Sequence, residues 1–96
     1  MTTTITLGPL QLAGLICHAP QDDIDALGLD GPRLTVTDAD HAAEIVNDAS
    51  NSADAQHERD GELMDRRMAV ALAMLAGRIR RAARLRFAAS DAVVVG

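Results

Sequence analysis

The 96 residues predict one small domain of the α+β class: an N-terminal β-hairpin and a short third strand, packed on a C-terminal αα-hairpin with one long helix. Before Thr37, apolar and polar side chains alternate, as on a half-buried strand. After Thr37, apolar residues recur every three or four positions, which is typical of amphipathic helices. We therefore expect residues 1–37 to be mainly strand and loop, residues 38–90 to be helical, and residues 91–96 to form a short strand or a frayed tail.

The predicted hairpin consists of strands Thr3–Leu7 and Leu10–Cys17. Threonine and isoleucine alternate in the first strand and suit a pleated surface. Gly8 and Pro9 are turn residues and predict the connection between the strands. Gly14 interrupts the second strand, where we expect a bulge or a bend.

Residues 18–32 predict a loop rich in aspartate, glycine and proline. Within the loop, the spacing of Ile24 and Leu27 predicts a helical turn around Gln21–Leu27. The third strand is predicted over Arg33–Thr37, because Leu34 and Val36 alternate with polar residues there.

The first helix of the predicted αα-hairpin opens at the pattern formed by Thr37 and Asp40, a serine or threonine followed three residues later by an acid. Asparagine, serine and aspartate fill the segment Asn47–Asp54, and these residues favour caps over helix interiors. We therefore expect this helix to end between Asp48 and Asn51.

The second helix is expected to begin between Asp54 and Glu62 and to end near Leu85–Phe87, because this stretch lacks proline and is rich in strong helix formers. The β-branched tail Ala92–Val95 is expected to add a strand to the hairpin or to remain frayed.

The second helix carries apolar side chains on two opposite faces. One stripe is expected to face the core and comprises Met68, Leu72, Leu75, Ile79 and Ala83. The candidate interaction residues Leu63, Val70 and Met74 lie on the far side. A helix that is apolar nearly all round is buried all round. The second cover is therefore either the first helix or a two-fold mate, and we favour the mate because the first helix offers mainly alanine.

The composition also favours a partner. Eighteen residues are alanine, one is phenylalanine, and tyrosine and tryptophan are absent. Aromatic side chains bury the most area per residue, so a lone chain of this composition would have a thin core.

All nine basic residues are arginine, which we attribute to the codon supply of a GC-rich bacterium or its phage.

Charge is distributed unevenly along the chain. Residues 1–58 hold ten acids and one arginine, hence a net −9, whereas residues 59–96 hold eight arginines and four acids, hence +4. The overall charge of −5 argues against nonspecific nucleic-acid binding by the whole surface. The candidate phosphate-binding residues are therefore confined to Arg80, Arg81 and Arg84, within the arginine cluster Arg78–Arg86. We favour a structural role for this cluster, because cations near a helix C-terminus complement the helix dipole.

Two Asp-x-x-His steps, Asp38–His41 and Asp54–His57, have a spacing that binds metals on helices, with Glu44 and Asp48 as further ligands. Each step also lies at an expected helix start, where aspartate caps the backbone. The acidic loop at residues 22–31 lacks the ligand spacing of a calcium loop. We therefore predict no metal, no cofactor and no catalytic site.

The sequence thus predicts a small non-catalytic protein–protein interaction protein that forms a homodimer and has another protein as a further partner. The alternative is a nucleic-acid-binding or regulatory protein that uses the arginine cluster. Cys17 is the only cysteine, which fits a reducing cytoplasm. Gly8 and Pro9 would break a membrane-spanning helix in the uncharged N-terminal segment, so we expect no membrane association.

Overall fold

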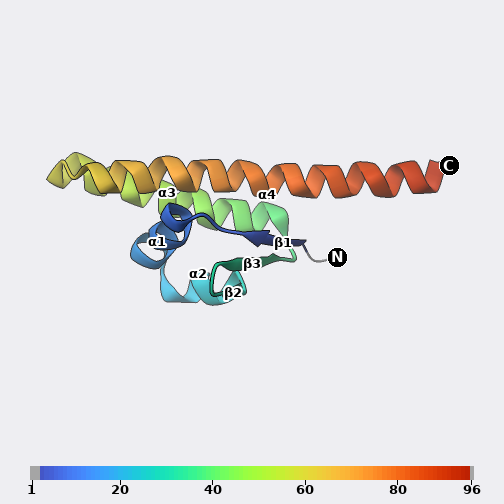
Figure 1. Ribbon diagram of the computed structural model, residues 1–96, viewed down its shortest axis with the longest axis horizontal. Helices are drawn as coiled ribbons and strands as arrows, with labels where there is room; N and C mark the ends of the chain where they lie inside the picture. The colour runs from blue at the N-terminus through green and yellow to red at the C-terminus, as the bar shows by residue number, and fades with distance from the viewer. Residues whose placement is uncertain (1–2, 96) are drawn as a thin grey trace.

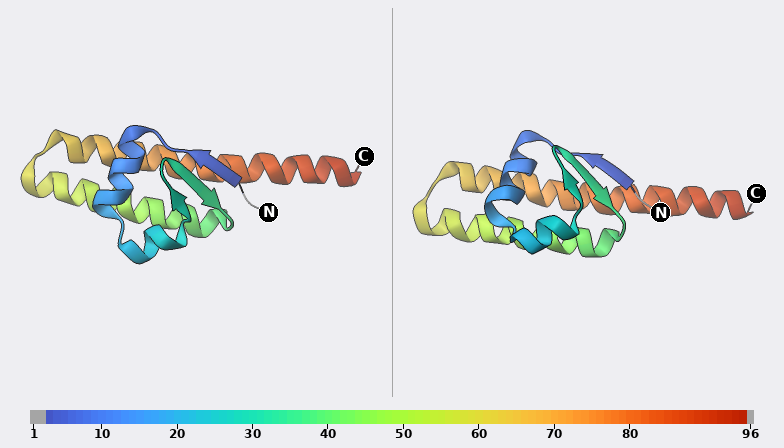
Figure 2. Two further views of the ribbon diagram at one scale, coloured as in Figure 1. Left: turned by 60° about the horizontal axis from the view of Figure 1, so that its bottom comes forward. Right: turned by 90° about the horizontal axis from the view of Figure 1, so that it is seen from below.

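The computed structural model describes the backbone of residues 3–95 and the side chains of residues 4–83. Two long helices, α3 (Ala39–Asp60) and α4 (Leu63–Val95), form an antiparallel hairpin. The N-terminal elements form a second layer on one face of that hairpin (Figures 1 and 2). This arrangement confirms the predicted α+β class, with a three-stranded antiparallel sheet and long C-terminal helices.

The sheet has the order β1-β3-β2, with β1 at Thr3–Thr6, β2 at Leu29–Asp30 and β3 at Arg33–Val36. Both pairings are antiparallel, and Leu34 of the central strand lies between Ile5 and Leu29. The alternation seen in the sequence sets the two faces, since Leu34 and Val36 are buried while their neighbours are exposed.

The second strand of the predicted hairpin is wrong, because helix α1 (Pro9–His18) replaces it. Proline is well suited to the first position of a helix, where its missing N–H leaves no bond unmade. Gln11 also caps the helix start, as its Oε1 accepts a hydrogen bond from the Gly8 N–H at 3.0 Å. The leucines of this segment are thus spaced for a helix, and β1 pairs with β3 instead.

The short helix α2 (Gln21–Ala26) confirms the helical turn predicted in the loop. Its residues are not buried, but Leu27 directly after it is 2% exposed and belongs to the core. The loop therefore places one leucine in the core and leaves Asp22, Asp25 and Asp30 exposed.

Helix α3 is longer than predicted, because it continues through the Asn- and Ser-rich segment to Asp60. Ala49 and Ala53 are buried there, and the Ser50 hydroxyl donates to the Ala69 carbonyl of α4 at 2.7 Å. Packing against α4 thus overrides weak helix propensity. The helix stops at Gly61, whose φ of 69° is the left-handed conformation that glycine adopts without strain.

Helix α4 begins at Leu63, one residue beyond the predicted interval, and continues to Val95. The short strand expected at Ala92–Val95 is therefore wrong, as is the helix end expected near Leu85–Phe87. Figure 1 shows the last part of α4 extending beyond the other elements. The long dimension of the molecule is 54 Å, against about 20 Å for the other two.

Candidate functional site

Helix α4 presents two different faces to its surroundings. Leu72, Leu75 and Ile79 are at most 1% exposed and pack in the core, as predicted for this stripe. On the opposite face, Leu63 is 59% exposed, Val70 47% and Met74 63%. We expect these side chains to be buried either by the first helix of the hairpin or by a two-fold mate. The first helix, α3, does not bury them. The large apolar side chains of this face therefore contact solvent in the single chain.

A shallow depression of 320 Å³ lies between α4 and the start of α1. Its lining consists of Leu10, Arg66, Arg67, Val70, Ala71 and Met74. Four of these residues are apolar, and the other two are arginines of α4. The depression unites Val70 and Met74, two of the predicted interaction residues, whereas Leu63 lies outside its lining.

Leu10, Arg66 and Arg67 were missed as site residues by sequence reasoning. The sequence predicts Leu10 in a strand rather than on a helix beside α4. Only the helix that begins at Pro9 brings Leu10, 37% exposed, beside Val70 and Met74. No local pattern in the sequence indicates a contact between positions sixty residues apart in the chain.

Arg78 is part of the arginine cluster but joins three elements of the fold. Its guanidinium donates to the Gln11 Oε1 and to the Thr6 carbonyl, both at 3.0 Å. Gln11, 8% exposed, donates in turn from its Nε2 to the Ala71 carbonyl at 3.3 Å. This network holds α4 against β1 and α1, so Arg78 has a structural role.

The other candidate phosphate ligands are only partly within the described side chains. Arg80 and Arg81 are adjacent and exposed to solvent. The side chain of Arg84 lies outside the described residues. The structure thus presents two neighbouring guanidinium groups on the surface of α4. Phosphate binding by these two groups stays a prediction.

The two Asp-x-x-His steps contribute to helix ends and to contacts between helices. Asp38 is the N-cap of α3 and accepts a hydrogen bond from the His41 N–H at 3.1 Å. Asp54 forms an ion pair with Arg66 at 2.8 Å. His57 contacts the Glu62 carbonyl through Nδ1 at 2.8 Å. Among the side chains that the structure describes, no group of three or more His, Cys, Asp or Glu residues is placed to hold a metal.

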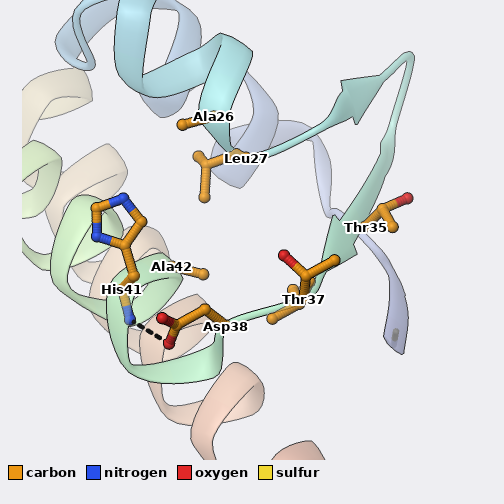
Figure 3. A pocket seen from close by; sticks show the side chains of 8 residues that line it. Ala26, Leu27, Thr35, Thr37, Asp38, His41 and Ala42 are labelled. Atoms are coloured by element: carbon orange, nitrogen blue, oxygen red, sulfur yellow. Dashed lines mark hydrogen bonds between the residues drawn. The ribbon is translucent and has the colours of Figure 1, made fainter. Parts of the chain in front are cut away.

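Beside the α3 N-cap, a small pocket lies between Leu27, the end of β3 and the first turn of α3 (Figure 3). Its volume is 20 Å³, which matches the space that one water molecule needs. Figure 3 also shows the Asp38 carboxylate joined to the His41 backbone N–H by a hydrogen bond. The pocket is thus part of the capping region and has no room for a larger ligand.

The α3–α4 turn is a compact acidic site. The two Asp60 carboxylate oxygens accept hydrogen bonds from the Glu62 N–H at 2.9 Å and from Gln56 Nε2 at 2.8 Å. These bonds, the Glu62 N–H foremost, lower the pKa of Asp60 below the usual value for aspartate. Asp60, the last residue of α3, is thus held as an anion at the turn that leads to the start of α4.

Comparison of the chain with protein-family models, with curated proteins and with solved structures finds no match of any of the three kinds. Over the described part of the chain, none of the helices combines the length and the apolar character needed to cross a bilayer.

Proposed function

We propose that this chain is a small non-catalytic protein–protein interaction protein that forms a homodimer through the exposed face of α4. This outer face comprises Leu63, Arg67, Val70, Met74, Gly77 and Arg81. The observation that carries the proposal is the exposure of Val70 and Met74, which adjoin Leu10 in one apolar depression. Contiguous exposed apolar side chains of this kind mark interaction sites on soluble proteins.

The shape and the composition of the outer face support a protein partner over a small ligand. Pockets for small molecules bury most of the ligand surface, whereas this depression is shallow. Protein interfaces combine an apolar centre with a polar rim, in which arginine is enriched. Val70 and Met74 provide such a centre, and Arg66 and Arg67 provide part of such a rim.

The alternative is nucleic-acid binding through the adjacent, exposed Arg80 and Arg81. Its support is weaker, because Arg78 of the same cluster already binds Gln11 and Thr6. A DNA or RNA probe that shifts on adding the protein, with an affinity that falls steeply as salt rises, would favour this alternative.

The setting that we propose is the cytoplasm of a GC-rich bacterium or of a cell infected by its phage. Cys17 supports a reducing compartment, because this single thiol is exposed and has no partner cysteine in the chain. The use of arginine for all nine basic residues supports the GC-rich origin.

A double variant tests the proposal. Val70→Asp/Met74→Asp places two carboxylates in the centre of the expected contact, where an uncompensated buried charge is strongly destabilising. We expect the wild type to be a dimer and the variant a folded monomer, measured by light scattering and circular dichroism. The variant should fold because both positions are exposed in the single chain.

The matched control is Ile16→Asp on α1, since Ile16 is an apolar side chain 61% exposed that does not line the depression. This control should remain dimeric. A double variant that stays dimeric, or a control that dissociates equally, would place the interface elsewhere.

A further inference from the structure

We infer that the occupant of the α4 outer face is a second copy of this chain whose α4 runs antiparallel, with Val70 of each copy against Met74 of the other. The inference rests on the proposed homodimer and specifies its orientation and its register. It also assigns pairing roles to Arg67, Gly77 and Arg81, residues without an obvious apolar signal.

The spacing of the outer face is that of a helix-pairing seam. Its six residues are separated alternately by four and three positions, beginning at Leu63 and ending at Arg81. This is the heptad spacing with which two helices pack side by side. All six residues are exposed in the single chain, so the seam is accessible over its whole length.

A parallel pair would oppose identical residues along this seam. Arg67 would meet the partner's Arg67, and Arg81 would meet the partner's Arg81. Like charges placed directly opposite one another across an interface destabilise it. The seam therefore disfavours the parallel orientation by two arginine–arginine contacts.

An antiparallel pair centred between Val70 and Met74 removes both clashes. Arg67 then lies opposite the partner's Gly77. A Cβ built on Gly77 meets no atom within 4 Å, so this position leaves open space for the arginine stem. Long basic side chains cover apolar surface with their stems while the charged end stays in water.

The same register accommodates Met74, the most exposed apolar side chain of the seam. The partner's Met74 lies opposite Val70, at the depression lined also by Leu10 and Ala71. Methionine is flexible and fills irregular apolar hollows of this kind. Two-fold symmetry repeats the contact, so each copy inserts one methionine and receives one.

The ends of the seam have complementary charge. In the antiparallel register, Arg81 lies opposite the partner's Leu63, directly after the acidic α3–α4 turn with Asp60 and Glu62. Both acids are exposed. Among the described residues, no hydrogen bond or ion pair to the Glu62 carboxylate is recorded, so it is available to a guanidinium from the partner. The two-fold axis supplies the same ion pair at the other end.

Disulfide trapping tests the orientation directly. In a Cys17→Ser background, one chain carries Val70→Cys and a second chain, made distinguishable by a tag, carries Met74→Cys. We expect oxidation of the mixture to give the mixed disulfide. Disulfides between two Val70→Cys chains or two Met74→Cys chains should be absent, because only unlike positions oppose each other. Leu63→Cys mixed with Arg81→Cys should behave in the same way. Leu63→Cys mixed with Val70→Cys is the matched control and should not crosslink.

A charge exchange provides a second readout. Glu62→Arg and Arg81→Glu should each weaken the dimer of the otherwise native chain, and the double variant should restore it. Like-with-like disulfides from a protein that is dimeric would overturn the antiparallel register and leave the proposed function standing. Absence of every crosslink together with a monomeric wild type in light scattering would overturn both.

Discussion

Gly14 sets the distance between α1 and α4. A Cβ built at this position would lie 2.9 Å from Leu72 Cδ1, closer than ordinary van der Waals contact. Leu72 is fully buried and has no space to retreat into. The residue that suggests a strand irregularity in the sequence is therefore a close helix–helix contact in the structure.

Gly14→Ala and Gly77→Ala form a matched pair that measures this contact, when both are made in the Val70→Asp/Met74→Asp background, where the outer face of α4 is not paired. Both substitutions place alanine inside a helix, so both gain the same intrinsic propensity. Only the first crowds a neighbour, and overpacking costs about 1–3 kcal/mol. We expect Gly14→Ala to be less stable than Gly77→Ala by about that amount, measured by urea unfolding at one protein concentration. Equal stabilities would show that α1 does not approach α4 as closely as described.

At the scale of elements, the sequence predicts best where periodicity and burial agree. The core stripe of α4 and the alternation in β3 are read directly from apolar spacing, and both are confirmed, except that Ala83 at the end of the stripe is only half-buried. The segment Pro9–His18 is misread because its leucines also fit a strand with a bulge. The early end predicted for α3 fails because Ala49 and Ala53 are buried against the next helix, a contact that local propensity does not contain.

The start of α3 gives a test of one capping assignment. The sequence offers two candidates for the N-cap, Thr37 and Asp38, and the structure assigns it to Asp38, whose side chain accepts from the His41 N–H. Loss of an N-cap side chain costs about 0.5–2 kcal/mol. We expect Asp38→Ala to lower the free energy of unfolding by about 1 kcal/mol and Thr37→Ala to have a clearly smaller effect, measured by thermal unfolding. A larger loss of stability in Thr37→Ala than in Asp38→Ala would show that Thr37 is the N-cap.

The sequence predicts part of the candidate site, namely the apolar residues of α4, but it does not predict the contact between α1 and α4. Leu63, Val70 and Met74 stand out because they lie opposite the core stripe on one helix. Leu10 becomes part of the site only through the fold, when α1 is placed against α4. The role of Gly77 is visible only when a second helix is considered, because this glycine has no neighbour in the single chain.

On the scale of the whole molecule, burial and charge lead to the same expectation. The described core is built mainly from leucine, isoleucine, valine and alanine, yet the single chain leaves Leu63, Val70 and Met74 uncovered on the outer face of α4. Pairing of α4 with its copy covers that surface and brings the basic part of each helix to the acidic turn of the other. Burial and charge therefore both favour dimerisation through the outer face.

Sedimentation equilibrium of the wild-type protein over a wide concentration range measures this dimerisation. We expect a mass of twice 10.1 kDa at high concentration, falling toward 10.1 kDa on dilution, because the pair is reversible. A mass of 10.1 kDa at every concentration up to the order of 1 mM would contradict dimerisation. At that concentration, only an association weaker than about −4 kcal/mol goes undetected.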